Sequence, residues 1–250
     1  MSSISFIETF ITNGADALEI GIHFSDPVAD GVLIQEAARV ALEEGTSVED
    51  CFAALTRIRD NYPNIPIGLL TYANLVYRPG IDNFYSKCQS AGVDSVLIAD
   101  VPLCESEAFI NAADNASVDA VFIAPPNASD KTLQDISKLK GGYTYVVSRA
   151  GVTGDKNKVE FPVNVVNSLL DNNAPAPVLG FGISKAKHVR SAASYGFKGV
   201  ISGSAITRII RKQLVKASEK THLETIKGIN DELKTFSEKM KIATLVGNNQ

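Results

Sequence analysis

The sequence has little cysteine and histidine and no long apolar run. Its three cysteines, Cys51, Cys88 and Cys104, form no CxxC pair, which argues against a disulfide framework or a cysteine metal site. We interpret them as reduced, mostly buried thiols of a cytoplasmic protein. The three histidines are far apart in the sequence and give no metal motif. No apolar run is long enough for a membrane span, and the first ten residues do not resemble a signal peptide.

An excess of positive charge is also absent. The 250 residues carry a formal net charge of −4, so bulk charge recruits neither nucleic acid nor an anionic membrane. Basic residues gather only near the C-terminus, where we interpret Arg208, Arg211, Lys212 and Lys216 as a solvated helix face. Hydrophobic residues make up 45% of the chain, which is enough for a large core.

Short apolar strands alternate with amphipathic helices along the chain. After a helix at 4–13 and a strand that begins segment 17–31, strands are expected at 65–73, 95–101, 120–125, 143–150, 177–183 and 199–204. This alternation predicts a parallel sheet. Without a domain-scale linker, it favours a single (β/α)8 TIM-barrel domain over residues 1–250. Only seven strands are evident, because the chain opens on a helix where a barrel should open on a strand.

Segment 17–31, ALEIGIHFSDPVADG, is the stretch with the most chemical information. Its apolar residues point to one face of the strand, whereas Glu19 points to the other face between two very small residues. A buried, charged and unpaired carboxylate costs about 2–7 kcal/mol or more, so it is rarely placed there for stability alone. Asp26 and Asp30 follow in the next loop. The alternative is an exposed Glu19 on an edge strand and two aspartates that form turns.

Two glycine-bearing turns near the end of the chain predict a phosphate site. One consists of Gly180, Phe181, Gly182, Ile183 and Ser184, and the other contains Gly203 and Ser204. Each leads into a helix, so backbone N–H groups and a helix N-terminus would meet there. A dinucleotide fingerprint is excluded because Lys185 occupies its third glycine position. The alternative is that these glycines only relieve crowding between strand and helix.

The loop Arg149–Lys158 contains glycines and charged residues but few apolar anchors. It could therefore act as a lid over the barrel mouth. A plain surface loop is the alternative.

Taken together, these motifs resemble those of one known protein family. LEIGIHFSDPVADG, PIGLLTYANLVY, GVDSVLIADVP, FIAPPNAS, GYTYVVSRAGVTG, GFGIS and ISGSAI occur in this order and spacing. They closely resemble the α subunit of tryptophan synthase, from about Ile4 to the last helix. The resemblance implies a (β/α)8 barrel that cleaves indole-3-glycerol phosphate to indole and glyceraldehyde 3-phosphate. It also implies a pyridoxal-phosphate β subunit as partner, in an αββα complex, and no cofactor in this chain.

The resemblance assigns roles to individual residues. It makes Glu19 the general acid–base and places Asp30 at the indole nitrogen. It carries over Tyr72, Tyr145 and Thr153 as substrate-site residues, and it matches the two glycine-bearing turns to the phosphate site. It places Asp26, Pro27 and Asp100 in segments that face the β subunit.

The sequence departs from the family in two ways. The N-terminal helix and first strand of family members have no counterpart, so two sheet edges are expected to be exposed. His23 and Val32 stand where many relatives have proline, and His23 lies in the loop that faces the β subunit.

The reaction suits these residues, because a carboxyl group in an apolar barrel has a raised pKa and can protonate indole C3. Two other functions stay open at this stage. One is a catalytically weak or inactive partner that binds and activates the β subunit. The other is a different phosphate-sugar barrel enzyme, such as an epimerase. An epimerase would need a second catalytic acid across the barrel, and the strand ends supply no obvious one.

Overall fold

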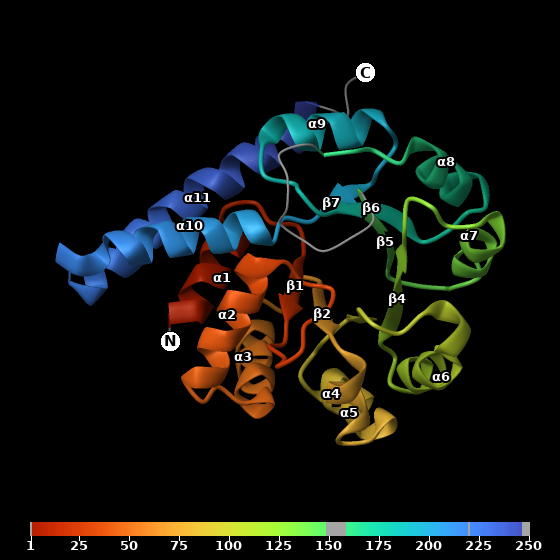
Figure 1. Ribbon diagram of the computed structural model, residues 1–250, viewed down its shortest axis with the longest axis horizontal. Coiled ribbons are helices and arrows are strands. Elements are labelled where there is room, and N and C mark those ends of the chain that lie inside the picture. The colour runs from red at the N-terminus through yellow and green to blue at the C-terminus, as the bar shows by residue number, and fades with distance from the viewer. Residues whose placement is uncertain (1, 149–158, 220, 247–250) are drawn as a thin grey trace.

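A computed structural model describes residues 2–148, 159–219 and 221–246 (Figure 1). Within them, a single curled sheet contains seven parallel strands in sequence order. The strands are β1 Leu18–Gly21, β2 Ile67–Thr71, β3 Ser95–Ile98, β4 Asp119–Ala124, β5 Tyr143–Val147, β6 Ala176–Gly180 and β7 Gly199–Val200. The predicted α/β class and seven evident strands are confirmed. Among the described residues β1 and β7 are the two edges, so the strands alone do not close a barrel.

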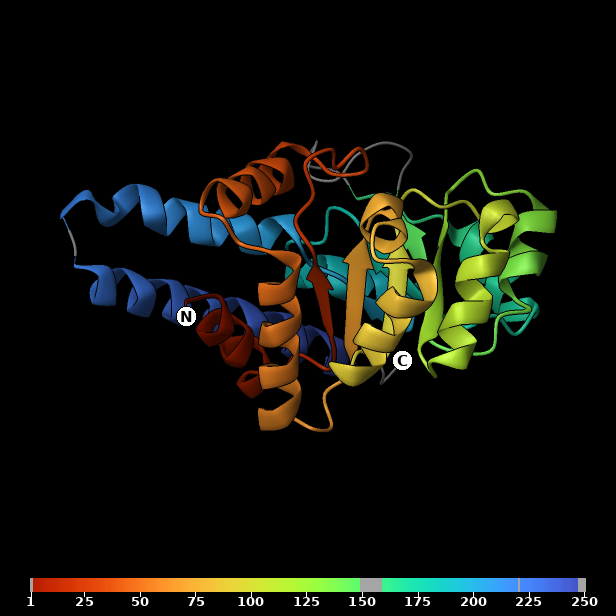
Figure 2. The same ribbon diagram turned by 90° about the horizontal axis from the view of Figure 1, so that it is seen from below.

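Helices cover the outer face of the curled sheet (Figures 1 and 2). They are α1 Ser2–Thr12, α2 Val32–Glu43, α3 Val48–Asn61, α4 Ala73–Tyr77, α5 Ile81–Ser90, α6 Glu107–Asn115, α7 Asp130–Ile136, α8 Val163–Asp171, α9 Ala186–Ser194, α10 Ser204–Val215 and α11 His222–Val246. Two 3₁₀ turns lie at Leu103–Glu105 and Lys216–Glu219. The last helix packs against α1, α9 and α10. No helix in this described part is long and apolar enough to cross a membrane.

The predicted alternation along β1 is confirmed by the side chains that are buried on each face of the sheet. Leu18 and Ile22 are buried in the outer core with Phe52 and Leu55 of α3. A separate inner cluster contains Leu97, Val121, Tyr145 and Val147. Because successive side chains point to opposite faces, packing of the apolar residues outward turns Glu19 inward.

Local hydrogen bonds define the start of two helices. Ser47 caps α3 and forms a capping box with Asp50. The short helix α4 was not expected; the Asp100 carboxylate accepts a hydrogen bond from the Ala73 N–H at its start, 2.8 Å. The strand expected at 199–204 has only two residues in β7, because β6 is its only neighbour in the described sheet. An edge strand receives pairing from one side only.

Surface and cysteine predictions are mostly confirmed. The basic residues of α10 and its following turn, Arg208, Arg211, Lys212 and Lys216, are at least partly exposed. All three cysteines are free thiols, and Cys88 is fully buried. Cys104 is exposed, which contradicts the expectation of mostly buried thiols, because it lies in a 3₁₀ turn between β3 and α6.

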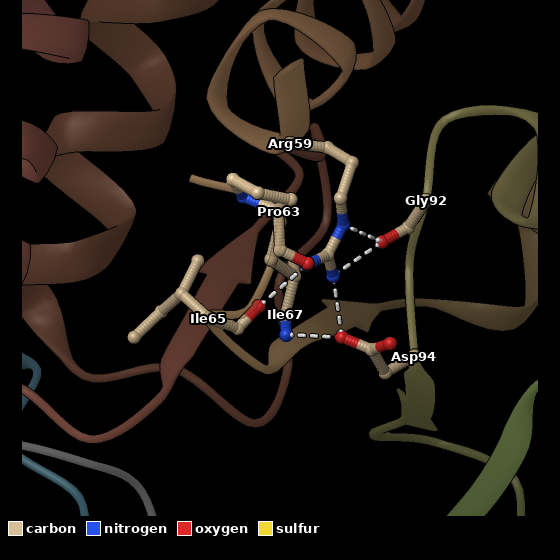
Figure 3. Close-up of polar contacts among 6 residues, drawn as sticks. All are labelled: Arg59, Pro63, Ile65, Ile67, Gly92 and Asp94. Atoms are coloured by element: carbon tan, nitrogen blue, oxygen red, sulfur yellow. Dashed lines mark hydrogen bonds and ion pairs between the residues drawn. The ribbon is translucent and has the colours of Figure 1, made fainter. Parts of the chain in front are cut away.

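Arg59 of α3 joins the N-terminal ends of the neighbouring strands β2 and β3 (Figure 3). Its guanidinium donates to the carbonyl oxygens of Gly92, Pro63 and Ile65 over 2.7 to 2.9 Å. It also pairs with the Asp94 carboxylate at 2.6 Å. A side chain at Gly92 would collide with the Arg59 stem, since an added Cβ would lie 2.6 Å from Arg59 Cγ.

The same Asp94 oxygen accepts a hydrogen bond from the Ile67 N–H, 2.7 Å. The start of β2, the turn before β3 and the end of α3 therefore share one polar cluster. The Arg59 side chain is only 20% exposed, and its bonds to the Gly92 and Ile65 carbonyl oxygens are partly buried.

We expect Arg59→Met to lower the free energy of unfolding by about 3 kcal/mol, because several charge-assisted hydrogen bonds are lost at a partly buried place. Urea unfolding measures the change. Arg57→Met is the matched control, since Arg57 is exposed on the same helix, and we expect it to cost no more than about 0.5 kcal/mol. Equal effects of the two substitutions would contradict the role given to the Arg59 cluster.

Candidate functional site

Glu19 points into the curled sheet from β1, where its register partner on β2 is Gly68. The Tyr143 hydroxyl, from β5 on the far side of the interior, donates a hydrogen bond to Glu19 Oε1. Burial raises the pKa of Glu19 to about 7, against the Tyr143 hydrogen bond, which lowers it. At neutral pH this carboxyl group is therefore present in both protonation states and can give or take a proton.

Gly68 leaves room for this contact. A Cβ at this position would lie 3.1 Å from Ser95 Oγ and 3.7 Å from the Tyr143 hydroxyl oxygen. The small residues beside Glu19, noted in the sequence, are thus matched by a small residue on the next strand. Beyond Gly21 the interior is open, since no atom of the described residues lies within 4 Å of an added Cβ.

Asp30 lies in the loop after β1 and is held by Tyr72. The Tyr72 hydroxyl donates to Asp30 Oδ2 at 2.7 Å and accepts from the Ala29 N–H at 3.2 Å. Burial raises the pKa of Asp30, and the Tyr72 hydrogen bond lowers it. The Phe24 ring stacks on Tyr72 at a centroid distance of 5.2 Å. Asp30 is therefore a second carboxyl group with a tyrosine donor.

Tyr145 connects the two carboxyl groups with the first glycine-bearing turn. Burial raises the pKa of its hydroxyl, and the negative charges of Glu19 and Asp30 raise it further. Its ring meets Phe181 edge to face at 6.2 Å. A Cβ at Gly180 would lie only 2.2 Å from the Tyr145 hydroxyl oxygen, so this close approach requires glycine.

The two glycine-bearing turns lie at the ends of neighbouring strands, as expected for successive β/α units. In the first, Phe181 and Gly182 adopt positive φ angles of 65° and 75°. Gly203 caps α10 in the second, and an added Cβ there would meet no described atom within 4 Å. Backbone groups at such a turn and helix start are accessible to a small anion.

The residues expected to face a partner lie in and beside the loop after β1. Asp26 is exposed and accepts a hydrogen bond from Ser25 Oγ at 2.6 Å. His23 Nδ1 lies 3.8 Å from Cys51 Sγ. Pro27 is half-buried. Asp100, which caps α4, is exposed.

Two apolar side chains in and after the same loop are also exposed, Val28 at 69% and Val32 at 78%. Neither was expected from the sequence to face a partner.

Two expectations fall outside the described residues, namely Thr153 and the lid at 149–158. Sequence reasoning also missed Tyr143, the hydrogen-bond donor of Glu19. The period-two alternation of YTYVV places Tyr143 and Tyr145 on the same face of β5, and this signal could have found it. Among the described residues, no group of three histidine, cysteine, aspartate or glutamate side chains could hold a metal ion.

We expect the stability of the protein to depend on Glu19 in a defined pH window. Below its ordinary pKa of 4.5 the carboxyl is protonated in both states, and burial carries no charge penalty. As the pH rises to about 7 the unfolded chain ionises first, so stability is lost. Glu19→Gln should then be more stable than the parent by up to about 3 kcal/mol at pH 8.

Urea unfolding of Glu19→Gln and the parent at several pH values checks this, because all other titrating groups are common to both. The difference between the two should grow between about pH 4.5 and 7 and then stay constant. A difference that does not vary across this range would contradict the raised pKa of Glu19.

Comparisons with known proteins agree with this arrangement. Residues 1–240 match the family model described as tryptophan synthase alpha chain. The chain is 52% identical over 244 residues to the tryptophan synthase alpha chain of Francisella tularensis subsp. tularensis (strain WY96-3418), covering 97% of this chain and 87% of the relative. It is 55% identical over 213 residues to that of Photobacterium profundum, covering 85% and 79%.

A solved structure agrees as well. It comes from a structural study of mutual activation in the tryptophan synthase a2b2 complex of the hyperthermophile Pyrococcus furiosus. The matched chain has a TM-score of 0.83 and 31% identity, over 96% of this chain and 91% of the other. The protein therefore belongs to the tryptophan synthase alpha chain family.

Proposed function

We propose that Glu19 is the acid–base of a lyase that cleaves indole-3-glycerol phosphate to indole and glyceraldehyde 3-phosphate. The observation that carries this proposal is the inward Glu19 carboxyl group, whose pKa burial raises to about 7. Family membership supplies the reaction. The geometry supplies a group that can act as acid and then as base near neutral pH.

The reaction is a retro-aldol cleavage. Protonated Glu19 gives its proton to indole C3, and the ring nitrogen becomes positively charged. The C3′ hydroxyl of the glycerol arm then loses its proton to the Glu19 carboxylate. The carbon–carbon bond breaks, its electron pair returns to the indole ring, and C3′ becomes the aldehyde carbon. Glu19 ends protonated again, so the cycle needs no net proton.

Asp30 is proposed to stabilise the positive charge on the indole nitrogen. In its ionised form it carries the opposite charge, and the Tyr72 hydroxyl fixes its orientation at 2.7 Å. A charge that is already oriented stabilises a transition state without reorganisation. Tyr145, whose hydroxyl pKa is raised by the charges of both carboxyl groups, is proposed as a substrate contact of the same pocket. Thr153 is proposed as a further substrate contact.

The two glycine-bearing turns are proposed to bind the phosphate of the substrate. They involve Gly180 to Ser184 after β6, and Gly203 with Ser204 at the start of α10. The positive φ angles of Phe181 and Gly182 and the α10 N-terminus at Ser204 are features that phosphate sites use. A phosphate held there would leave the glycerol arm directed towards Glu19.

A β subunit is the proposed partner. The solved Pyrococcus relative is part of an a2b2 complex, and the proposed complex here is the corresponding αββα tetramer. The proposed surface contains His23, Asp26, Pro27 and Asp100, together with the exposed Val28 and Val32. Apolar residues with polar neighbours are typical of the core and rim of an interface.

A catalytically weak partner that only activates the β subunit is the second candidate. The observation that favours it is the gap between β1 and β7 in the described sheet. Indole release from indole-3-glycerol phosphate, measured with and without a β subunit, separates the two. Cleavage that rises with β supports the lyase, whereas β activation without any cleavage supports the weak partner.

We expect Glu19→Gln to lower kcat for indole release at least about 100-fold, since removal of a general acid–base costs about 10²–10⁴-fold. The fold and β-subunit activation should persist, because glutamine has the same shape. Glu44→Gln, on an exposed residue after α2, is the matched control and should keep full activity. Activity of Glu19→Gln within about tenfold of the parent would contradict the assignment of Glu19 as the acid–base.

We expect Val28→Asp to weaken β-subunit binding by about tenfold or more, because burial of an added charge at an apolar contact is unfavourable. Titration calorimetry against the β subunit measures this. Val40→Asp is the control, since Val40 is also exposed, at 47%, but lies in the middle of α2. The same affinity for both variants would remove Val28 from the interface.

A further inference from the structure

The turn after β6 needs support, because two successive residues adopt left-handed backbone angles. Phe181 has a φ of 65° and Gly182 a φ of 75°. The first is unfavourable for a residue with a side chain. The Phe181 carbonyl oxygen accepts a hydrogen bond from Ser148 Oγ at 3.3 Å. Contacts from outside the turn must therefore hold its conformation.

Two side chains hold the two ends of a single peptide group in this turn. The Ile183 carbonyl oxygen accepts a hydrogen bond from Ser202 Oγ at 2.7 Å. The Ser184 N–H, at the other end of the same peptide, donates to His188 Nδ1 at 3.3 Å. Ser202 follows β7, whereas His188 belongs to α9. Since a peptide group is planar, the two bonds together fix the orientation of that plane.

His188 is in the state that this contact requires. The residue is 9% exposed. Burial lowers the pKa of His188, and the charges of Lys187 and Lys185 lower it further, against a hydrogen bond with the Gly182 backbone that raises it. A backbone N–H can only donate, so Nδ1 is the unprotonated nitrogen of a neutral ring. His188 thus acts on the turn as an acceptor.

We propose that His188 is a positioning residue of the phosphate site, which acts by holding the Ile183–Ser184 peptide together with Ser202. This inference rests on the phosphate site proposed above. It assigns the Ser184 N–H to His188 and leaves phosphate binding to the other backbone N–H groups of the two turns. With the peptide plane fixed, these N–H groups keep their direction before the substrate arrives. The binding free energy is then not reduced by the entropy loss of ordering them.

Two substitutions at this position separate the hydrogen bond from packing. His188→Asn keeps an acceptor, because its Oδ1 stands where Nδ1 of histidine stands. His188→Leu places a carbon there instead. Val189→Ala is the matched control, since Val189 is buried on the same helix, 3% exposed, and its truncation destabilises α9 without removing a hydrogen bond to the turn.

The measurements are the Kd of glycerol 3-phosphate by calorimetry, and kcat and KM for indole release. For His188→Leu we expect Kd and KM to rise by roughly tenfold while kcat changes by less than about twofold, the size of one lost hydrogen bond. His188→Asn should stay within about threefold of the parent, because the acceptor is retained. Val189→Ala should lower the melting temperature and leave the Kd unchanged.

Each outcome supports or overturns the positioning role of His188. An unchanged Kd for His188→Leu, or a His188→Asn as weak as His188→Leu, overturns it. If the parent binds no glycerol 3-phosphate, the phosphate site itself is wrong and the inference falls with it. If His188→Leu does not fold, Ser202→Ala tests the other end of the same peptide. A Kd that rises by a similar factor supports the inference, and an unchanged Kd overturns it.

Discussion

The alternation of side chains along β1 is the constraint on which the site depends. Leu18 and Ile22 are fixed in the outer core by Phe52 and its neighbours on α3, and Glu19 must then point inward. A slip of one residue would bury the carboxyl among the helices and turn leucine into the interior. The packing that stabilises this strand therefore also holds the carboxyl group where burial raises its pKa.

Each of the two carboxyl groups has a tyrosine hydroxyl as its hydrogen-bond donor. Burial acts to raise the pKa of both, and the tyrosines Tyr143 and Tyr72 act in the opposite direction. For Glu19 the balance lies at about 7, so a proton can be given and regained at neutral pH. Without this donor the pKa of Glu19 would be higher still, and a smaller share of the group would be ionised at neutral pH. Tyr143 therefore contributes to the protonation balance of Glu19.

Local patterns in the sequence predicted what depends on near neighbours. Strand alternation and the seven evident strands are of this kind, and the inward direction of Glu19 followed from one strand. The alternation of YTYVV could have placed Tyr143 on the inner face, but its pairing with Glu19, 124 residues away in the chain, is not a local property. His188 has its partner only four residues away, yet a helical spacing says nothing about a contact with a turn before the helix. The length of β7 depends on its neighbours in the sheet, which no stretch of its own sequence records.

Helices join the two parts of the proposed site that the strands leave apart. Glu19 lies on one edge strand and the phosphate turns follow the other end of the sheet, with no described pairing between β1 and β7. Across this gap α10, which begins at Ser204, packs on α2, and Arg211 pairs with Glu36 at 3.0 Å.

A second pair of helices, α1 before β1 and α11 after β7, also packs together. Asn230 of α11 accepts a hydrogen bond from Thr9 of α1 at 3.0 Å and donates one to Ser5 at 2.8 Å. The exposed ion pair contributes little, so the partly buried contacts of Asn230 and the packing of the helices act beside the Tyr143–Glu19 hydrogen bond across the interior. The helical layer therefore helps to set the distance between Glu19 and the proposed phosphate turns, and substitutions in it that touch no substrate are expected to alter KM and kcat together.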